Sequence, residues 1–257
     1  MPTLNVHGSA IYYAQAGEGV PALVFVHGAG ADHTLWGDQI KALSHEFTVA
    51  AIDLNGHGRS PRRAAEAGIP SYVEDVRSLC EALKRPTVLV GHSMGGAVAL
   101  TLALAPPKNL LALALVGTGA KLKVHPQILD LCRNDFAGAL DLIATWAFAP
   151  QASEELRQRS KAQMERNGAE TLLRDFSSCN EFDVLARLHE IQLPTLVLCG
   201  REDQLTPPKY SEFLQKNIAN ARLVLIEHAG HMVMLEQPQA LTEALRAFCI
   251  ELRSSLQ

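Results

Sequence analysis

The chain contains Gly91-His92-Ser93-Met94-Gly95, in which a serine stands two residues away from a glycine on each side. Residues 87–90, with the sequence Thr-Val-Leu-Val, are typical of a buried strand. Residues 96–100, with the sequence Gly-Ala-Val-Ala-Leu, are typical of the start of a helix. The five residues therefore stand at a predicted strand-to-helix corner, which is the structural setting that the G-x-S-x-G pattern requires.

At such a corner the turn is tight, and it lifts the serine hydroxyl clear of the sheet. It requires a strained backbone conformation at Ser93 and leaves no room for a side chain at Gly91 or Gly95. The sequence therefore predicts that Ser93 is a nucleophile. It also predicts that the backbone N–H of Met94 points to the place where an oxyanion would form.

Strand-like and helix-like segments alternate along the chain on either side of this corner. The expected strands are residues 3–7, 11–16, 22–26, 47–52, 87–90, 110–116, 194–199 and 223–226. The expected helices are residues 35–43, 72–83, 96–104, 209–217 and 238–252. This alternation predicts an α/β fold with a mostly parallel sheet of about eight strands, helices on both faces and an N-terminal hairpin.

One stretch, residues 120–190, interrupts the alternation because it contains no credible strand. Its composition is helical over residues 128–132, 137–146, 154–167 and 171–179. We expect residues 1–119 and 191–257 to form the core, with residues 120–190 inserted between two sheet strands as a helical cap. The cap would lie over the carboxyl ends of the strands, where open α/β sheets bind ligands. The alternative is a second helical domain with its own core and no catalytic part.

The composition excludes several classes of function. The 257 residues carry a formal net charge of -4, so the chain lacks the basic surface that a nucleic-acid partner would need. Its apolar stretches are too short to cross a bilayer, and its first residues lack the features of a signal peptide, so we expect a cytoplasmic protein without membrane insertion. The five cysteines are scattered and without C-x-x-C spacing, which favours buried free thiols over disulfides or a metal site.

A serine nucleophile needs a base within hydrogen-bond reach and an acid that orients the base. In the chain order Ser, Asp/Glu, His, the candidate acid is Asp203, which follows the predicted strand at residues 194–199. The loop there reads G-R-E-D-Q-L-T-P and is similar to the pattern G-x-x-D-x-x-x-P. Glu202 is the competing acid, and a helix-capping or surface carboxylate is the structural alternative.

The candidate base is His231, in the segment His-Ala-Gly-His-Met that follows the predicted strand at residues 223–226. Gly230 gives the backbone the freedom to place the imidazole. His228 is the competing histidine, and its position closer to the strand end suits a structural role.

A second oxyanion donor is expected from the loop that follows the strand at residues 22–26. The loop reads His27-Gly28-Ala29-Gly30-Ala31-Asp32, and its small residues allow backbone N–H groups to approach a ligand. We predict the N–H of Ala29 as the donor, with Gly30 as the alternative, and we expect His27 to organise the loop by hydrogen bonding. The structural alternative is a plain glycine-rich turn.

Residues 53–60, Asp-Leu-Asn-Gly-His-Gly-Arg-Ser, place glycines close to the end of a predicted strand. They lack the Lys-Ser/Thr of a P-loop and the spacing G-x-G-x-x-G. We therefore interpret them as a structural turn in which Asp53 and Arg59 form local hydrogen bonds or an ion pair.

These segments together resemble the α/β-hydrolase family: the His27-Gly28 loop, the G-H-S-M-G corner, the Asp203 and His231 pair, and the turn at residues 53–60, which is similar to the family's D-x-x-G-x-G-x-S. The resemblance covers residues 22–248. It is closest to small bacterial carboxylesterases, enol-lactonases and pimeloyl-ester hydrolases. In that group the residue after His-Gly donates to the oxyanion, which supports Ala29. Members with an aspartate nucleophile are disfavoured because position 93 is serine.

The resemblance implies a cofactor-independent and metal-free serine hydrolase, a monomer or homodimer, acting on a small-molecule ester or lactone. Non-haem haloperoxidases share the triad, but their aromatic residue before the serine is replaced here by His92. C–C bond hydrolysis or a lyase reaction with the same three residues is an alternative, and so is a ligand-binding receptor on the same fold. Substrate contacts are expected from two groups of residues, the loop residues Gly28, Gly30 and Met232 and the cap residues Leu122, Leu129, Phe136, Trp146 and Phe148.

Overall fold

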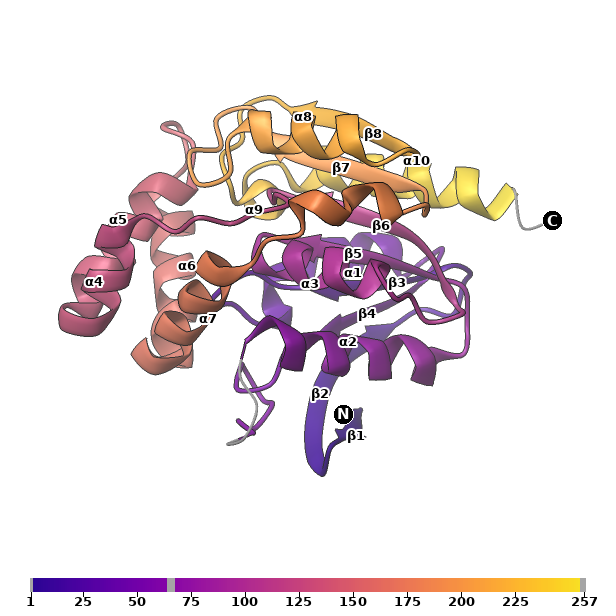
Figure 1. The fold of residues 1–257 in the computed structure, drawn as a ribbon, viewed down its shortest axis with the longest axis horizontal. Helices are drawn as coiled ribbons and strands as arrows, with labels where there is room; N and C mark the ends of the chain where they lie inside the picture. The colour runs from indigo at the N-terminus through magenta and orange to yellow at the C-terminus, as the bar shows by residue number, and fades with distance from the viewer. Residues whose placement is uncertain (1, 64–67, 255–257) are drawn as a thin grey trace.

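The computed structural model describes residues 2–63 and 68–254, which form an α/β structure around one eight-stranded sheet (Figure 1). The strands lie in the order β1-β2-β4-β3-β5-β6-β7-β8. Their bounds are β1 Thr3–Val6, β2 Ser9–Ala16, β3 Ala22–Val26, β4 Thr48–Ile52, β5 Thr87–His92, β6 Leu110–Val116, β7 Thr195–Gly200 and β8 Ala221–Ile226. β1 and β2 pair antiparallel, as does β2 with β4, and all other neighbours are parallel. The predicted fold class is therefore confirmed.

The central strands are buried on both faces, which explains their continuous apolar sequences. In β3, every residue from Ala22 to Val26 is buried, and successive side chains alternate between two hydrophobic clusters. Val24 and Val26 pack in the first cluster, whereas Leu23 and Phe25 pack in the second. This period of two divides the core into one layer on each side of the sheet.

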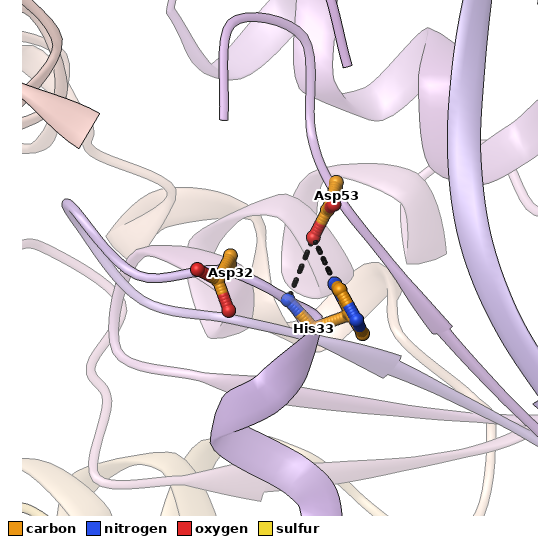
Figure 2. Close-up of side chains that lie close together, drawn as sticks. All are labelled: Asp32, His33 and Asp53. Carbon is orange, nitrogen blue, oxygen red and sulfur yellow. Dashed lines mark hydrogen bonds and ion pairs between the residues drawn. The ribbon is translucent and has the colours of Figure 1, made fainter. Parts of the chain in front are cut away.

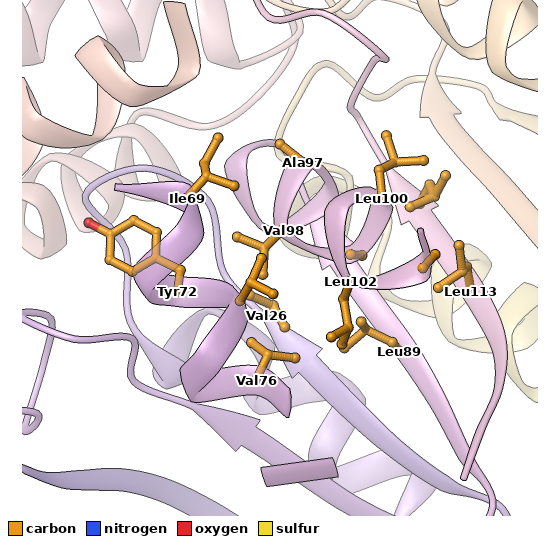
Figure 3. Close-up of a cluster of buried hydrophobic side chains, with 14 of the residues drawn as sticks. Val26, Ile69, Tyr72, Val76, Leu89, Ala97, Val98, Leu100, Leu102 and Leu113 are labelled. Atoms are coloured by element: carbon orange, nitrogen blue, oxygen red, sulfur yellow. The ribbon is translucent and has the colours of Figure 1, made fainter. Parts of the chain in front are cut away.

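Helices cover both layers. The helices of the core are α1 Gly37–Leu43, α2 Ile69–Leu83, α3 Met94–Ala103, α8 Pro208–Asn217, α9 Val233–Glu236 and α10 Pro238–Ser254, with the 3-10 turns η1 His33–Trp36 and η2 Leu185–Glu190. The first cluster contains side chains of α2, α3 and α8, and Figure 3 shows Tyr72 and Val76 of α2 packed beside Val98 of α3. The second cluster contains side chains of α1 and α10, such as Leu43 and Leu245.

Between β6 and β7 the chain forms four further helices, which we name the helical insertion: α4 Pro126–Asn134, α5 Phe136–Ala147, α6 Glu154–Asn167 and α7 Ala169–Glu181. Figure 1 shows them grouped at one end of the sheet. They share a small hydrophobic cluster that includes Ile128, Leu140 and Leu172. An isolated antiparallel β-bridge between Lys121 and Asp183 joins the two ends of the insertion, at residues where no extended segment was expected.

The remaining expectations about composition concern cysteines and membrane spans. All five cysteines are buried and free, as predicted. Within residues 2–63 and 68–254, none of the helices combines the length and the apolar character that crossing a membrane requires.

Candidate active site

Ser93 lies between the end of β5 and the first residue of α3, with φ 51° and ψ −115°. This conformation is rare for a residue with a side chain and stores strain at the corner. Close packing explains the two glycines, because a Cβ on Gly91 would lie 2.3 Å from the oxygen of Gly95. The surroundings hold the strained residue in place: the Ser93 N–H donates to the oxygen of Val116 (3.0 Å), and the hydroxyl of Thr118 donates to the oxygen of Ser93 (2.8 Å).

Asp203 and His231 lie next to each other, in the loops that follow β7 and β8. The Nδ1–H of His231 donates to Oδ2 of Asp203 at 2.9 Å, and both side chains are buried. The other oxygen of Asp203 accepts hydrogen bonds from the N–H groups of Leu205 (2.9 Å) and Thr206 (2.8 Å). The hydrogen bonds of its own loop therefore hold the carboxylate in place independently of its contact with the histidine.

The two competing residues are placed elsewhere. Glu202 is partly exposed and accepts a hydrogen bond from Gln151 (3.1 Å). His228 is exposed, in a left-handed backbone conformation with φ 56°, and its carbonyl oxygen accepts from Gln237 (3.1 Å). Neither side chain lines the cavity described below.

Thr206 is a member of this site that the sequence interpretation missed. Its hydroxyl donates to Oδ2 of Asp203 at 2.9 Å and lies 3.2 Å from Nδ1 of His231. Because a carboxylate only accepts, Nδ1 of His231 must carry a proton, which leaves Nε2 as the acceptor in the neutral ring. Thr206 therefore helps to hold the carboxylate that selects this tautomer.

The loop around His231 is fastened to the end of α5. The N–H of His231 donates to the oxygen of Ala147 at 2.8 Å. The carboxylate of Glu236 accepts from the N–H groups of Ala149 (2.8 Å) and Gly230 (2.9 Å). Burial raises the pKa of Glu236, although the hydrogen bonds from the backbone of Ala149 and Gly230 oppose this shift. The position of the histidine thus depends on a segment of the helical insertion.

Ser93 and His231 line the same cavity, which has a volume of about 630 Å³. Among the described residues, no direct hydrogen bond joins the Ser93 hydroxyl to the His231 ring. Such a bond is often long before substrate binds and shortens in the Michaelis complex.

His92, the neighbour of the candidate nucleophile, is buried against His231, with ring centroids 4.6 Å apart. Its Nε2–H donates to the oxygen of His231 at 3.1 Å. Burial and the adjacent imidazole of His231 hold the pKa of His92 well below its usual range, so the ring is neutral. His92 therefore braces the backbone of His231 without adding charge beside it.

The glycine-rich loop after β3 is organised by His27. The N–H of Leu54 donates to Nε2 of His27 (3.2 Å), so the proton of the neutral ring is on Nδ1, which donates to the oxygen of Gly28 (2.8 Å). Burial lowers the pKa of His27 to about 4, with a contribution from His57. In the peptide that joins Gly28 to Ala29, the held oxygen and the Ala29 N–H point in opposite directions. His27 thus sets the direction of the Ala29 N–H.

Ala29 lines the cavity together with Ser93, and Met94 follows Ser93 as the first residue of α3. Neither backbone N–H donates a hydrogen bond to any group in the part of the chain that the structure describes. Both groups therefore remain candidates for the predicted oxyanion donors, since such donors must be free to bind the substrate oxygen.

The cavity lies at the carboxyl ends of β3, β5, β7 and β8, and the helical insertion covers it. Of the predicted contact residues, Gly28, Leu122, Trp146 and Met232 line it. Lining residues that were not predicted include Ile128, Ile143, Met164, Phe176 and Tyr210. Three of these are apolar residues of α4, α5 and α6, so the wall is mainly hydrophobic.

Four predicted contact residues do not line the cavity. Gly30 is turned toward the insertion, where a Cβ would lie 2.5 Å from Leu172. Phe148 is buried in the second hydrophobic cluster under the guanidinium of Arg157. Phe136 packs in the insertion's own cluster, and Leu129 is on α4 outside the lining. Composition therefore did not predict the direction of each side chain, which decides whether it lines the cavity.

A possible metal-binding group lies at the end of the glycine-rich loop that follows β3. One ligand atom each from Asp32, His33 and Asp53 lie within 4.8 Å of one another. Figure 2 shows that Oδ1 of Asp53 already accepts from the backbone N–H and Nδ1 of His33, at 2.7 and 2.8 Å. Its other oxygen accepts from the N–H of Arg59 (2.9 Å), which is a local contact of the kind expected for this turn. The group joins two loops by hydrogen bonds and has the chemistry of a structural element.

The sequence and the fold of this chain are similar to those of known hydrolases. A sequence profile of the alpha/beta hydrolase fold matches residues 21–238. The chain is 30% identical over 241 residues to a putative carbamate hydrolase RutD of Pseudomonas savastanoi pv. phaseolicola, which covers 89% of this chain and 93% of that protein. It is 28% identical over 254 residues to 3-oxoadipate enol-lactonase 2 of Acinetobacter baylyi, with 95% of both chains covered. A solved structure of a thermophilic esterase has 35% identity and a TM-score of 0.90, and the match covers 98% of this chain and 97% of that one.

Proposed function

Because the chain belongs to the alpha/beta hydrolase family, as the sequence pattern predicted, we propose that it is a serine hydrolase that cleaves a small carboxylic ester or lactone through an acyl-enzyme on Ser93. The observation that carries the proposal is the buried pair of Asp203 and His231, in which His231 lines the same cavity as Ser93. A histidine held in one tautomer by a carboxylate, beside a strained serine, is the arrangement that activates a hydroxyl.

In the proposed reaction, Nε2 of His231 accepts the proton of Ser93 as the serine oxygen attacks the substrate carbonyl. Asp203 stabilises the resulting imidazolium, and the hydroxyl of Thr206 supports the carboxylate. The protonated ring then donates its proton to the leaving alkoxide. A water molecule, deprotonated in turn by His231, cleaves the acyl-enzyme and releases the acid.

We assign the oxyanion of each tetrahedral intermediate to the N–H groups of Ala29 and Met94. His27 directs the first through Gly28, and the start of α3 directs the second. Each such donor is worth ~3–4 kcal/mol of barrier in comparable sites.

The lining of the cavity favours substrates that carry apolar groups. Its volume of about 630 Å³ suits a small molecule, and its wall is built from side chains such as Ile143, Met164 and Trp146. The names of the matched relatives include a carbamate hydrolase, an enol-lactonase and an esterase. Their substrate classes share a carbonyl carbon bonded to a heteroatom, which is the group that a serine alkoxide attacks.

The test is a panel of p-nitrophenyl esters with acyl chains of increasing length, supplemented by lactones and an aryl carbamate. We expect turnover by the wild type, loss of essentially all of it in Ser93→Ala, and retention in the matched control Ser254→Ala, which alters an exposed serine at the end of α10. Labelling with diethyl p-nitrophenyl phosphate should add one diethylphosphoryl group to the wild type and none to Ser93→Ala, as measured by intact mass. Wild-type turnover by folded Ser93→Ala would exclude the proposal.

A further inference from the structure

The helical insertion contains a fully buried carboxylate, that of Asp175 on α7. Oδ2 accepts hydrogen bonds from the backbone N–H of Gly30 (2.9 Å) and from Nε2 of His57 (2.7 Å). Oδ1 accepts from the hydroxyl of Tyr72 at 2.6 Å. Burial alone would raise the pKa of Asp175, but the charge and hydrogen bond of His57 and the bonds from Tyr72 and Gly30 lower it. The side chain is therefore an anion, and each of its two oxygens accepts at least one hydrogen bond.

A second residue of the insertion, Asn167, binds the carbonyl oxygen of Gly30. Nδ2 of Asn167, the last residue of α6, donates to the oxygens of Gly30 (2.9 Å) and Ala31 (3.1 Å). Its own oxygen accepts from the N–H of Gly58 at 2.8 Å. The N–H and the C=O of Gly30 are thus both bonded to the insertion.

These contacts flank the candidate oxyanion donor. Ala29 stands between Gly28, whose oxygen is held by His27, and Gly30, which is held by Asp175 and Asn167. Gly30 has φ 66°, which lies in the left-handed region. Because a glycine adopts positive and negative φ with similar ease, contacts from outside the loop are needed to keep it in one conformation. Asp175 also contacts His57, whose ring packs on His27 with centroids 4.7 Å apart.

We propose that Asp175 and Asn167 are positioning residues for the oxyanion hole, which makes the helical insertion part of the catalytic apparatus as well as the wall of the cavity. This inference rests on the proposed function, because it takes the Ala29 N–H as an oxyanion donor. Donors stabilise a transition state only when they are already oriented, so release of Gly30 should lower kcat with little effect on KM.

The variant Asp175→Ala removes the acceptor for the Gly30 N–H. We expect its kcat for the best ester to fall roughly 10- to 100-fold, a fraction of the loss for a deleted donor. In Asp175→Asn, the amide oxygen can still accept from Gly30 while the amide N–H faces the hydroxyl of Tyr72, so we expect most of the kcat to be recovered.

A purely structural role is separated by comparing an ester with its thionoester, in which sulfur replaces the carbonyl oxygen. Sulfur accepts hydrogen bonds weakly, so the thionoester gains little from the oxyanion hole. A disordered oxyanion loop should therefore lower the ratio of ester to thionoester kcat at least fivefold. General loosening of the fold would lower both rates together and leave the ratio unchanged.

Two controls accompany these variants. Tyr72→Phe removes another hydrogen bond of the same carboxylate without touching Gly30, and Asp141→Asn changes an exposed carboxylate of the same insertion that pairs with Lys161. Both should keep the wild-type ratio, and Tyr72→Phe should lower the melting temperature. Asn167→Ala should lower the ratio in the same direction as Asp175→Ala.

Circular dichroism and thermal melting decide which variants are folded. If Asp175→Ala does not fold, Asn167→Ala carries the test, because Asn167 lies at a helix end and is only partly buried. A ratio within twofold of the wild type in every folded member of this pair would overturn the inference. That outcome differs from failure of the proposed function, in which Ser93→Ala itself would retain turnover.

Discussion

A Cβ atom on Gly95 would lie 2.4 Å from the carbonyl oxygen of Val26, a distance at which two backbones cannot both stay in place. The start of α3 is therefore pressed directly against the end of β3. This contact brings the loop of Gly28 and Ala29 next to Ser93, since a Cβ on Gly28 would lie 3.2 Å from the Cβ of Ser93. The candidate nucleophile and its predicted oxyanion donor are neighbours because position 95 has no side chain.

The first prediction concerns this contact. Gly95→Ala should destabilise the fold by roughly 1–3 kcal/mol or more and remove most activity, because overpacking displaces α3 from β3. Gly37→Ala is the matched control, since its φ is −53° and nothing lies within 4 Å of an added Cβ. It should stabilise the protein by up to about 1 kcal/mol. Urea unfolding of both variants, with ester turnover, tests the difference, and a Gly95→Ala protein as stable as Gly37→Ala would contradict it.

The second prediction concerns Thr206, which donates to Asp203 and contacts His231. Thr206→Val keeps the shape of the side chain but removes the hydroxyl, and a hydrogen bond to a charged group contributes about 1.5–3 kcal/mol. We expect kcat to fall roughly 10-fold with KM unchanged, because the hydroxyl acts on the acid–base pair. Thr206→Ser should restore most of the rate in the same steady-state assay. Equal rates for the Val and Ser variants would show that the hydroxyl has no such role.

The third prediction is a pH dependence of stability that originates in His27. Its pKa is about 4 in the folded protein and near 6.5 when unfolded, so the unfolded chain binds the proton more tightly. The contribution of His27 to the free energy of unfolding is therefore fully present above pH 6.5 and is lost as the pH falls toward 4. The His27 contribution to the loss between pH 7 and pH 5 is on the order of 2 kcal/mol. The lowered pKa of His92 acts in the same direction.

Denaturant unfolding at several pH values checks this expectation. His27→Asn should flatten the dependence between pH 7 and pH 5, whereas His45→Asn, at an exposed position, should keep the wild-type slope. The same slope in His27→Asn and wild type would show that another group is responsible.

The fourth prediction concerns acyl-chain selectivity. Trp146 lines the cavity, where its ring packs edge-on against His125. Trp146→Ala should enlarge the cavity and shift the best p-nitrophenyl ester to a longer acyl chain, with a change in relative kcat/KM of roughly 10-fold for each accommodated methylene. Phe213→Ala, at an exposed aromatic residue of α8, is the control and should keep the wild-type preference. An unchanged preference in Trp146→Ala would place the acyl group elsewhere.

The order of strands and helices could be predicted from the sequence because its signals are local. The buried strands contain continuous apolar runs, such as β3 and the first four residues of β5, and the G-H-S-M-G corner begins in the last two residues of β5. Asp203 and His231 could be selected for the same reason, since each is in a loop that directly follows a strand.

Contacts that span the chain gave no comparable signal. Asp175 reaches Gly30 across 145 residues, and nothing around either residue marks the pair. The cavity wall was only partly predictable, because a helix residue lines a cavity or packs in a core according to how the helices pack. Phe148 and Trp146 differ by two positions, yet one is buried in the second hydrophobic cluster and the other lines the cavity.

Two of the attachments between the helical insertion and the core set a condition for protein engineering. One joins Asp175 and Asn167 to Gly30, and the other joins Ala147 and Ala149 to His231, Gly230 and Glu236. A chimera that grafts residues 120–190 from another hydrolase to change specificity also exchanges the partners of these loops. A graft that keeps both attachments, or restores them with matching residues, should change the wall of the cavity while the loops of Gly30 and His231 keep their positions.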